Sequence, residues 1–66
     1  MKLLTKRQID CLKWLMEGFS SKQIASKLKI QEDTVNEHIQ ETKRRLKVSN
    51  RVEAVVKALK LGILTL

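Results

Sequence analysis

Four segments of the chain place hydrophobic residues at the three- and four-residue spacing of an amphipathic α-helix. We expect helices over residues 6–17, 21–29, 32–47 and 51–61. Residues that favour turns are scarce, with no Pro and two Gly, whereas an all-β chain needs them about every 8–12 positions. The pattern therefore predicts an all-α fold of four helices, and a length of 66 residues allows one domain at most.

Capping signals precede the first two predicted helices. Thr5 with Gln8, and Ser20 with Gln23, have the spacing of a capping box, in which the hydroxyl accepts from a backbone N–H of the first turn and the Gln reaches back. The third helix follows Gln31, and Gln is a poor N-cap. Its first turn is expected to fray when nothing is bound to it.

The last two predicted helices differ in how their hydrophobic residues are distributed. The third has one buried stripe, at Val35, Ile39, Thr42 and Leu46. The fourth is apolar on more than one face, which is more than a short helix in a small domain needs for its own core. We expect one face to meet the core and another to form a surface for a partner.

The composition narrows the classes of function. The 66 residues include 14 Lys+Arg and 7 Asp+Glu, a formal charge of +7 that points to a polyanion such as nucleic acid, or less favourably to an anionic membrane. A single Cys and a single His exclude an internal disulfide and a four-ligand zinc site. No hydrophobic run approaches the roughly 20 residues of a membrane span. We expect a cytoplasmic protein without a metal or cofactor.

A cluster of cations spans the predicted end of the third helix and the start of the fourth. Five of them fall within nine positions, where they complement the negative end of a helix and can grip phosphates; a solvated basic surface is the alternative for any one of them. They are Lys43, Arg44, Arg45, Lys47 and Arg51.

A short helix, a brief turn and a longer helix together form the helix-turn-helix pattern. Further fragments fall at fixed spacings along the chain: Leu4-Thr5-x-Arg7, Gly18-x-Ser20, Lys22-x-Ile24-Ala25-x-x-Leu28-x-Ile30, Thr34-Val35-x-x-His38-Ile39, Arg45-Leu46-x-Val48 and Arg51-x-x-Ala54-Val55. As an ordered set they resemble the LuxR/GerE-type helix-turn-helix family of bacterial transcription regulators, over about residues 4–64. The resemblance implies a four-helix domain that binds double-stranded DNA as a homodimer, with the third helix in the major groove and the fourth against its twofold mate.

The resemblance also assigns roles to individual residues. Base reading falls to Asn36, Glu37 and Gln40; Asn and Gln can pair bidentately with adenine, and Glu can accept from cytosine N4. Helix N-termini offer free N–H groups to phosphate, and the residues that match phosphate contacts there are Thr5, Ser21, Lys22 and Thr34. Thr5 and Ser21 could equally serve only as caps. The candidates for the dimer seam are Val52, Val56 and Leu59.

The predicted third helix departs from the family in its charge. The position of Asn36 is usually Lys or Arg in the family, and residues 31–42 carry four acids and no cation. That acidity favours an alternative function, a protein–protein interaction module that reuses the fold with weak or no DNA binding. An enzyme is the least favoured class, because the sequence shows no nucleophile–base pair, phosphate loop or metal cluster.

Three single residues have structural interpretations that we prefer. Cys11 is expected to be a small core residue, His38 a packing residue beside the buried stripe, and Trp14 a core residue or a contact with another domain. Only four residues precede Thr5, so we expect no receiver or ligand-sensing domain and no small-molecule ligand. The chain is then either a stand-alone regulator or the output domain of a longer one, with RNA polymerase as a further candidate partner.

Overall fold

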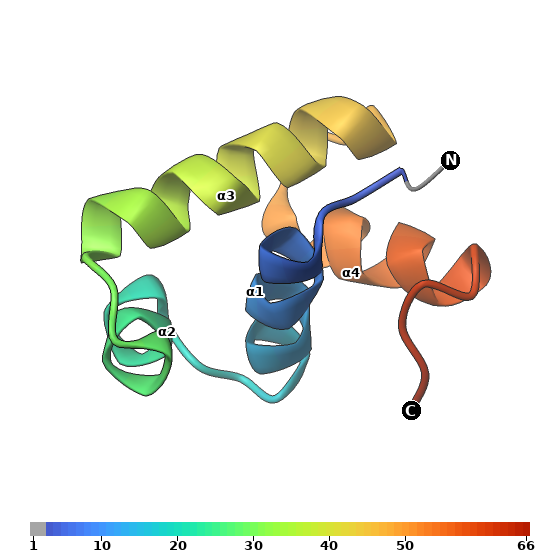
Figure 1. Ribbon diagram of the computed structural model, residues 1–66. Helices are drawn as coiled ribbons and strands as arrows, with labels where there is room; N and C mark the ends of the chain where they lie inside the picture. The colour runs from blue at the N-terminus through green and yellow to red at the C-terminus, as the bar shows by residue number, and fades with distance from the viewer. Residues whose placement is uncertain (1–2) are drawn as a thin grey trace.

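The computed structural model describes residues 3–66. Within them the chain forms four helices and no strand: α1 (Lys6–Met16), α2 (Ser21–Leu28), α3 (Glu32–Leu46) and α4 (Arg51–Lys60). The predicted all-α fold is confirmed. The longest helix, α3, lies along one side of the molecule, and the other three helices pack together on its other side (Figure 1). One long face of α3 is therefore left uncovered.

The first turns of α1 and α2 are held by the predicted capping boxes. The Gln8 backbone N–H donates to Thr5 Oγ1 at 3.2 Å, and the Thr5 N–H donates to Gln8 Oε1 at 2.9 Å. Ser20 and Gln23 repeat the arrangement at the start of α2. Gln31, in contrast, makes no side-chain cap to α3, as predicted. A good N-cap typically contributes about 1 kcal/mol, so α3 depends on its packing more than its neighbours do.

Each helix ends one residue earlier than predicted, and the residue that follows acts as its C-cap: Glu17, Lys29, Lys47 and Leu61. Lys29 and Lys47 adopt a left-handed conformation, with φ of 58° and 57°, which a residue with a side chain rarely does. The next residues, Ile30 and Val48, pack against the core. Their burial offsets the roughly 1–2 kcal/mol cost of the lysine backbone.

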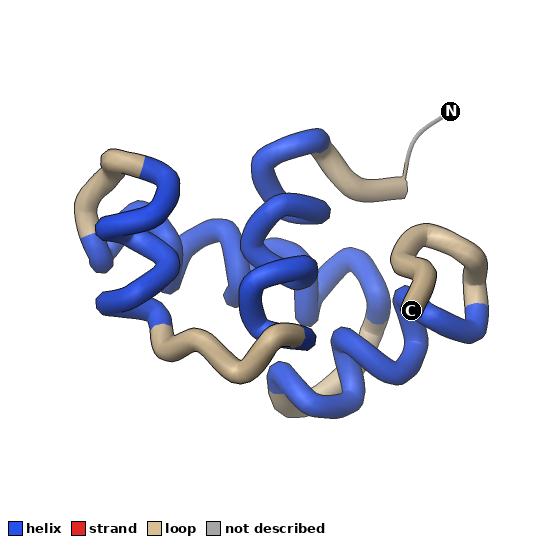
Figure 2. Tube along the Cα trace, turned by 90° about the horizontal axis from the view of Figure 1, so that it is seen from below, coloured by secondary structure: helices blue, strands red, loops and turns tan. Residues whose placement is uncertain are grey.

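The core consists of two clusters, and α1 and α3 contribute to both of them. Figure 2 shows the helices and the loops that connect them from below. One cluster joins α1 and α3 to α2, and its buried residues are Cys11, Ile24, Ala25, Val35 and Ile39. The other joins them to α4 and to both ends of the chain, and its buried residues are Leu4, Leu12, Leu46, Ala54, Ala58 and Leu64. Because α3 contributes to both clusters, its direction is fixed relative to the other three helices.

Candidate nucleic-acid interface

The orientation of α3 depends on the tight connection that joins it to α2. α2 ends at Leu28 and Lys29 is its C-cap; the Ile30 N–H then donates back to the Ala25 carbonyl at 3.0 Å, so the chain turns within the three residues between the helices. α2 and α3 then pack on one another through Ile24, Val35 and their neighbours in the core. This is a helix-turn-helix arrangement, in which the second helix is presented outward.

The two faces of α3 differ sharply in burial. The predicted stripe of Val35, Ile39, Thr42 and Leu46 is buried. Thr42 is tolerated there because its hydroxyl donates to the His38 carbonyl at 2.7 Å, so no polar atom is left without a partner. The predicted base-reading residues are all exposed on the uncovered side: Asn36, Glu37 and Gln40. Amide and carboxylate groups are thus available along the middle of the helix.

Charge is distributed unevenly along α3. Glu32 and Asp33 occupy its first turn, where negative charge favours the positive end of the helix dipole. Three cations occupy the last turn, and Glu41 forms ion pairs with two of them, Arg44 at 2.9 Å and Arg45 at 3.1 Å. The Glu41–Arg45 pair joins residues four positions apart on the same face of the helix. The acids of the first half face solvent, and the cations gather at the end of the helix.

The predicted phosphate residues fall into two regions of the surface. Four surround the junction of α3 and α4 in exposed positions, namely Arg44, Arg45, Lys47 and Arg51, and Lys43 beside them is half-buried. The others lie at the beginnings of helices: Thr5 before α1, Ser21 and Lys22 in the first turn of α2, and Thr34 in the first turn of α3. Lys22 is exposed and Thr34 half-buried.

Thr5 and Ser21 differ in their hydrogen bonding. Thr5 is exposed, but its hydroxyl oxygen already accepts the capping hydrogen bond, so its structural role is established. Ser20, not Ser21, caps α2. The Ser21 hydroxyl is buried and has no hydrogen-bond partner among residues 3–66.

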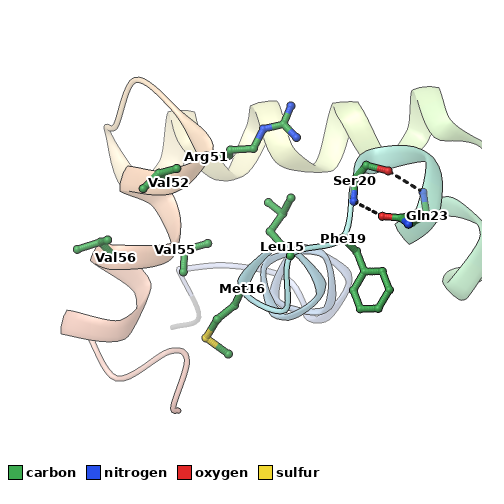
Figure 3. A pocket seen from close by; sticks show the side chains of 10 residues that line it. Leu15, Met16, Phe19, Ser20, Gln23, Arg51, Val52, Val55 and Val56 are labelled. Carbon is green, nitrogen blue, oxygen red and sulfur yellow. Dashed lines mark hydrogen bonds between the residues drawn. The ribbon is translucent and has the colours of Figure 1, made fainter.

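The predicted dimer residues lie on α4, and their exposure differs. Val52 is 68% exposed and Val56 is 44% exposed, whereas Leu59 is half-buried against the core. Ala54 and Ala58 form the opposite, fully buried face. Val52 and Val56 also border a groove of about 480 Å³ between α4 and the end of α1, shown in Figure 3. Its other apolar walls come from Leu15, Met16, Phe19 and Val55.

The single Cys, His and Trp take the structural positions predicted for them, and Trp14 in addition contacts a lysine. Cys11 is fully buried, and that burial raises the pKa of its thiol. His38 is half-buried beside the stripe. Trp14 is half-buried and stacks edge-on against Phe19 at 5.2 Å, and the Lys27 ammonium lies 5.4 Å from its ring. In the described part of the chain, no cluster of His, Cys, Asp or Glu could hold a metal ion.

No helix within residues 3–66 is both long enough and apolar enough to cross a membrane.

Comparisons with known proteins agree with this geometry. Residues 2–58 match the family described as bacterial regulatory proteins, luxR family. The chain belongs to the luxR family. Over 98% of its length it superimposes on the solved structure of the transcription factor GerE, covering 97% of that chain with a TM-score of 0.94 and 40% identity. It is accordingly a luxR-family DNA-binding domain, from a family of transcription regulators rather than of enzymes.

Two curated luxR-type relatives show how much of a longer regulator such a domain represents. The chain is 45% identical over 62 residues to the quorum sensing-dependent transcriptional regulator VjbR of Brucella abortus. The matched segment covers 94% of this chain and 24% of VjbR. It is 48% identical over 54 residues to the nitrate/nitrite response regulator NarP of Escherichia coli, covering 82% of this chain and 25% of NarP. The chain thus spans about a quarter of the length of these relatives.

Several features of this luxR-family domain have no signal in the sequence. Arg45 donates from Nη1 to the carbonyl of Leu3 at 3.2 Å, a contact between residues 42 positions apart. The Lys27 ammonium lies over Phe19 as well, at 5.0 Å from the ring centroid. The left-handed Lys29 and Lys47 lack the Gly that usually marks such a position. Each of these features depends on a contact with a residue that lies nearby only in the folded chain.

Proposed function

We propose that this chain is the sequence-specific DNA-binding unit of a bacterial transcription regulator, in which residues 4–64 act as one domain and α3 enters the major groove. The observation that carries this proposal is the contrast between the faces of α3. Asn36, Glu37 and Gln40 are exposed side by side on its uncovered face, while the opposite stripe is buried. A helix presented in this way can reach base edges without disturbing the core.

Base reading and phosphate binding are assigned to different parts of the surface. Asn36 and Gln40 would pair with adenine, and Glu37 with a cytosine amino group. The cations at the end of α3 and the start of α4, together with the helix starts of α1, α2 and α3, would hold the backbone. With about eight phosphate contacts per dimer, the logarithm of the binding constant should fall with that of salt at a slope near −7.

The unit would bind as a homodimer through α4. The exposure of Val52 and Val56 supports this, because two apolar side chains one helical turn apart are otherwise left in water. Leu59, half-buried at the same helix, would border the seam. The two copies of α3 would then enter successive major grooves, about 34 Å apart. A regulator of bacterial transcription would work in the cytoplasm, with RNA polymerase as its second partner.

Selection of binding sites from random duplex DNA at two salt concentrations tests the proposal. We expect an enriched, two-fold symmetric sequence whose half-sites are about one helical turn apart. Fluorescence anisotropy on the selected duplex should give the salt slope described above. A slope near zero, or no enriched sequence at either salt concentration, would contradict the proposed mechanism.

One observation favours a second candidate function, a protein-interaction module. Glu32, Asp33 and Glu37 are exposed on the half of α3 that would meet the DNA, and they pair with no cation among residues 3–66. Such a face is better suited to a basic protein surface than to phosphates. A dissociation constant for DNA no better than about 10⁻⁴ M at physiological salt would favour this function over DNA binding.

A further inference from the structure

The two adjacent arginines at the end of α3 have different surroundings. Arg44 is 75% exposed and makes one ion pair, from Nη1 to Glu41 Oε1 at 2.9 Å. Arg45 is 43% exposed and is held at two points, from Nε to Glu41 Oε2 at 3.1 Å and from Nη1 to the Leu3 carbonyl at 3.2 Å. One carboxylate therefore holds both guanidinium groups, and only one of them is also tied to a distant part of the chain.

The tie to Leu3 joins two parts of the proposed interface. Leu4, the next residue, is buried in the same cluster as Leu46, the residue after Arg45. Thr5 then caps α1. Arg45 thus fixes the end of α3 against the segment that leads into α1, beside a core contact that already brings the two together. Movement of either segment would have to break a charge-assisted hydrogen bond as well as a hydrophobic contact.

We propose that Arg45 and Glu41 are positioning residues for DNA binding: Arg45 locks α3 to the N-terminal segment, and Glu41 holds Arg45 in that lock and orients Arg44 toward the backbone. This inference rests on the proposed DNA-binding function. Arg45 suits the role because its planar group offers five donors in a fixed fork, of which two are used here. A lysine would offer one point charge and could not span both acceptors.

The direction in which DNA affinity changes when the charge of Glu41 is removed distinguishes positioning from simple charge repulsion. It carries negative charge on a helix that meets a polyanion, so long-range electrostatics alone predicts that removing its charge strengthens DNA binding. If Glu41 positions the arginines, removing its charge weakens binding: Arg44 loses its one ion pair and must be ordered by the DNA, and Arg45 keeps only its hydrogen bond to Leu3. The two accounts therefore predict opposite changes in affinity.

The test compares Glu41→Gln with Glu32→Gln. Glu32 lies on the same helix, is exposed and has no ion-pair partner among residues 3–66, so its substitution changes the net charge equally. The probe is a labelled mixed-sequence duplex of about two helical turns, which avoids any effect on base reading. We expect E41Q to bind about three-fold more weakly than the wild type, and E32Q to bind equally well or up to about two-fold more tightly.

The salt dependence of E41Q separates positioning from a purely structural role. If Arg44 no longer reaches a phosphate, the slope decreases in magnitude by about 0.9 for each phosphate that is no longer bound. A variant that was only less stable would keep the wild-type slope at temperatures where it is folded. Binding of E41Q as tight as that of E32Q would overturn the inference.

A second pair of variants, Arg45→Lys and Arg45→Ala, tests the lock even if E41Q does not fold. If the two hydrogen bonds of the guanidinium group are what matters, R45K behaves like R45A. Both variants then lower the unfolding temperature by a few degrees and weaken DNA binding about three- to ten-fold. If only the charge matters, R45K keeps the wild-type affinity and unfolding temperature, and the inference is wrong. A wild type that binds no duplex would instead refute the proposed function, and the lock would then be judged by the unfolding temperatures alone.

Discussion

Lys22 is the residue at which the proposed phosphate contacts can be tested most directly. It is exposed in the first turn of α2, beside a helix start whose backbone N–H groups favour an anion. It has no ion-pair partner among residues 3–66 and is not part of the core. Lys22→Ala should therefore leave the fold intact and remove only a cation from the interface.

The expected decrease in affinity follows from counterion release. Each bound phosphate adds about 0.9 to the magnitude of the salt slope. Lys22→Ala would remove one phosphate contact from each subunit of the dimer, so the magnitude of the slope should decrease by about 1.8. At about 0.15 M salt each bound phosphate is worth roughly a factor of five, which makes the combined decrease about 25-fold. That corresponds to about 2 kcal/mol of binding free energy. The decrease should be the same on the selected sequence and on mixed-sequence DNA, because phosphates carry no sequence information.

Lys13→Ala is the matched control for this measurement. Lys13 is also exposed, and it lies in the last turn of α1, which leads away from α3 (Figure 1). This substitution removes the same charge from a position with no proposed phosphate, so its slope should stay close to that of the wild type. Anisotropy titrations at several salt concentrations measure all three proteins. Equal slopes for K22A and K13A would refute phosphate binding by Lys22.

Four other outcomes test the site and the fold. Asn36→Ala or Gln40→Ala should relax base preference in site selection more than it weakens binding overall; a uniform loss would remove their reading role. Val56→Glu should give monomers in sedimentation experiments, and a dimeric variant would exclude this seam. Leu46→Ala should lower the free energy of unfolding by about 3–5 kcal/mol, and a whole domain of this size has only about 3–10 kcal/mol. Chemical denaturation measures this decrease and shows whether most of the variant protein is unfolded in buffer. Because burial raises the Cys11 thiol pKa, the unfolded chain loses this proton first; stability should fall above pH 9.0, and less steeply in Cys11→Ala.

The beginnings of the helices could be predicted because their determinants are local. A capping hydroxyl and the glutamine that completes the box are three residues apart, so the sequence contains both partners. The buried stripe of α3 follows from periodicity in the same way, down to Thr42, whose hydroxyl is satisfied by a carbonyl one turn earlier. The exposure of Asn36, Glu37 and Gln40 follows as well, since they occupy the remaining positions of a helix whose other face is buried.

The helix ends were predicted one residue too long for a related reason. Lys29 and Lys47 carry no local signal for a left-handed backbone, and they adopt it because Ile30 and Val48 gain core contacts when the chain reverses there. Whether that gain exceeds the backbone cost depends on the shape of the cluster that receives the side chain. That shape exists only after the helices have packed.

The sequence by itself determined the helical segments, their capped starts, the two faces of α3 and the family of the chain, because each depends on residues within a few positions of one another or on their order along the chain. Tertiary structure decided which of the clustered cations are restrained. The lock between Arg45 and Leu3 joins residues 42 positions apart, and the groove beside α4 combines side chains from α1, α2 and α4. No local rule specifies such pairings, since they form only where packing brings distant segments within hydrogen-bonding or van der Waals distance.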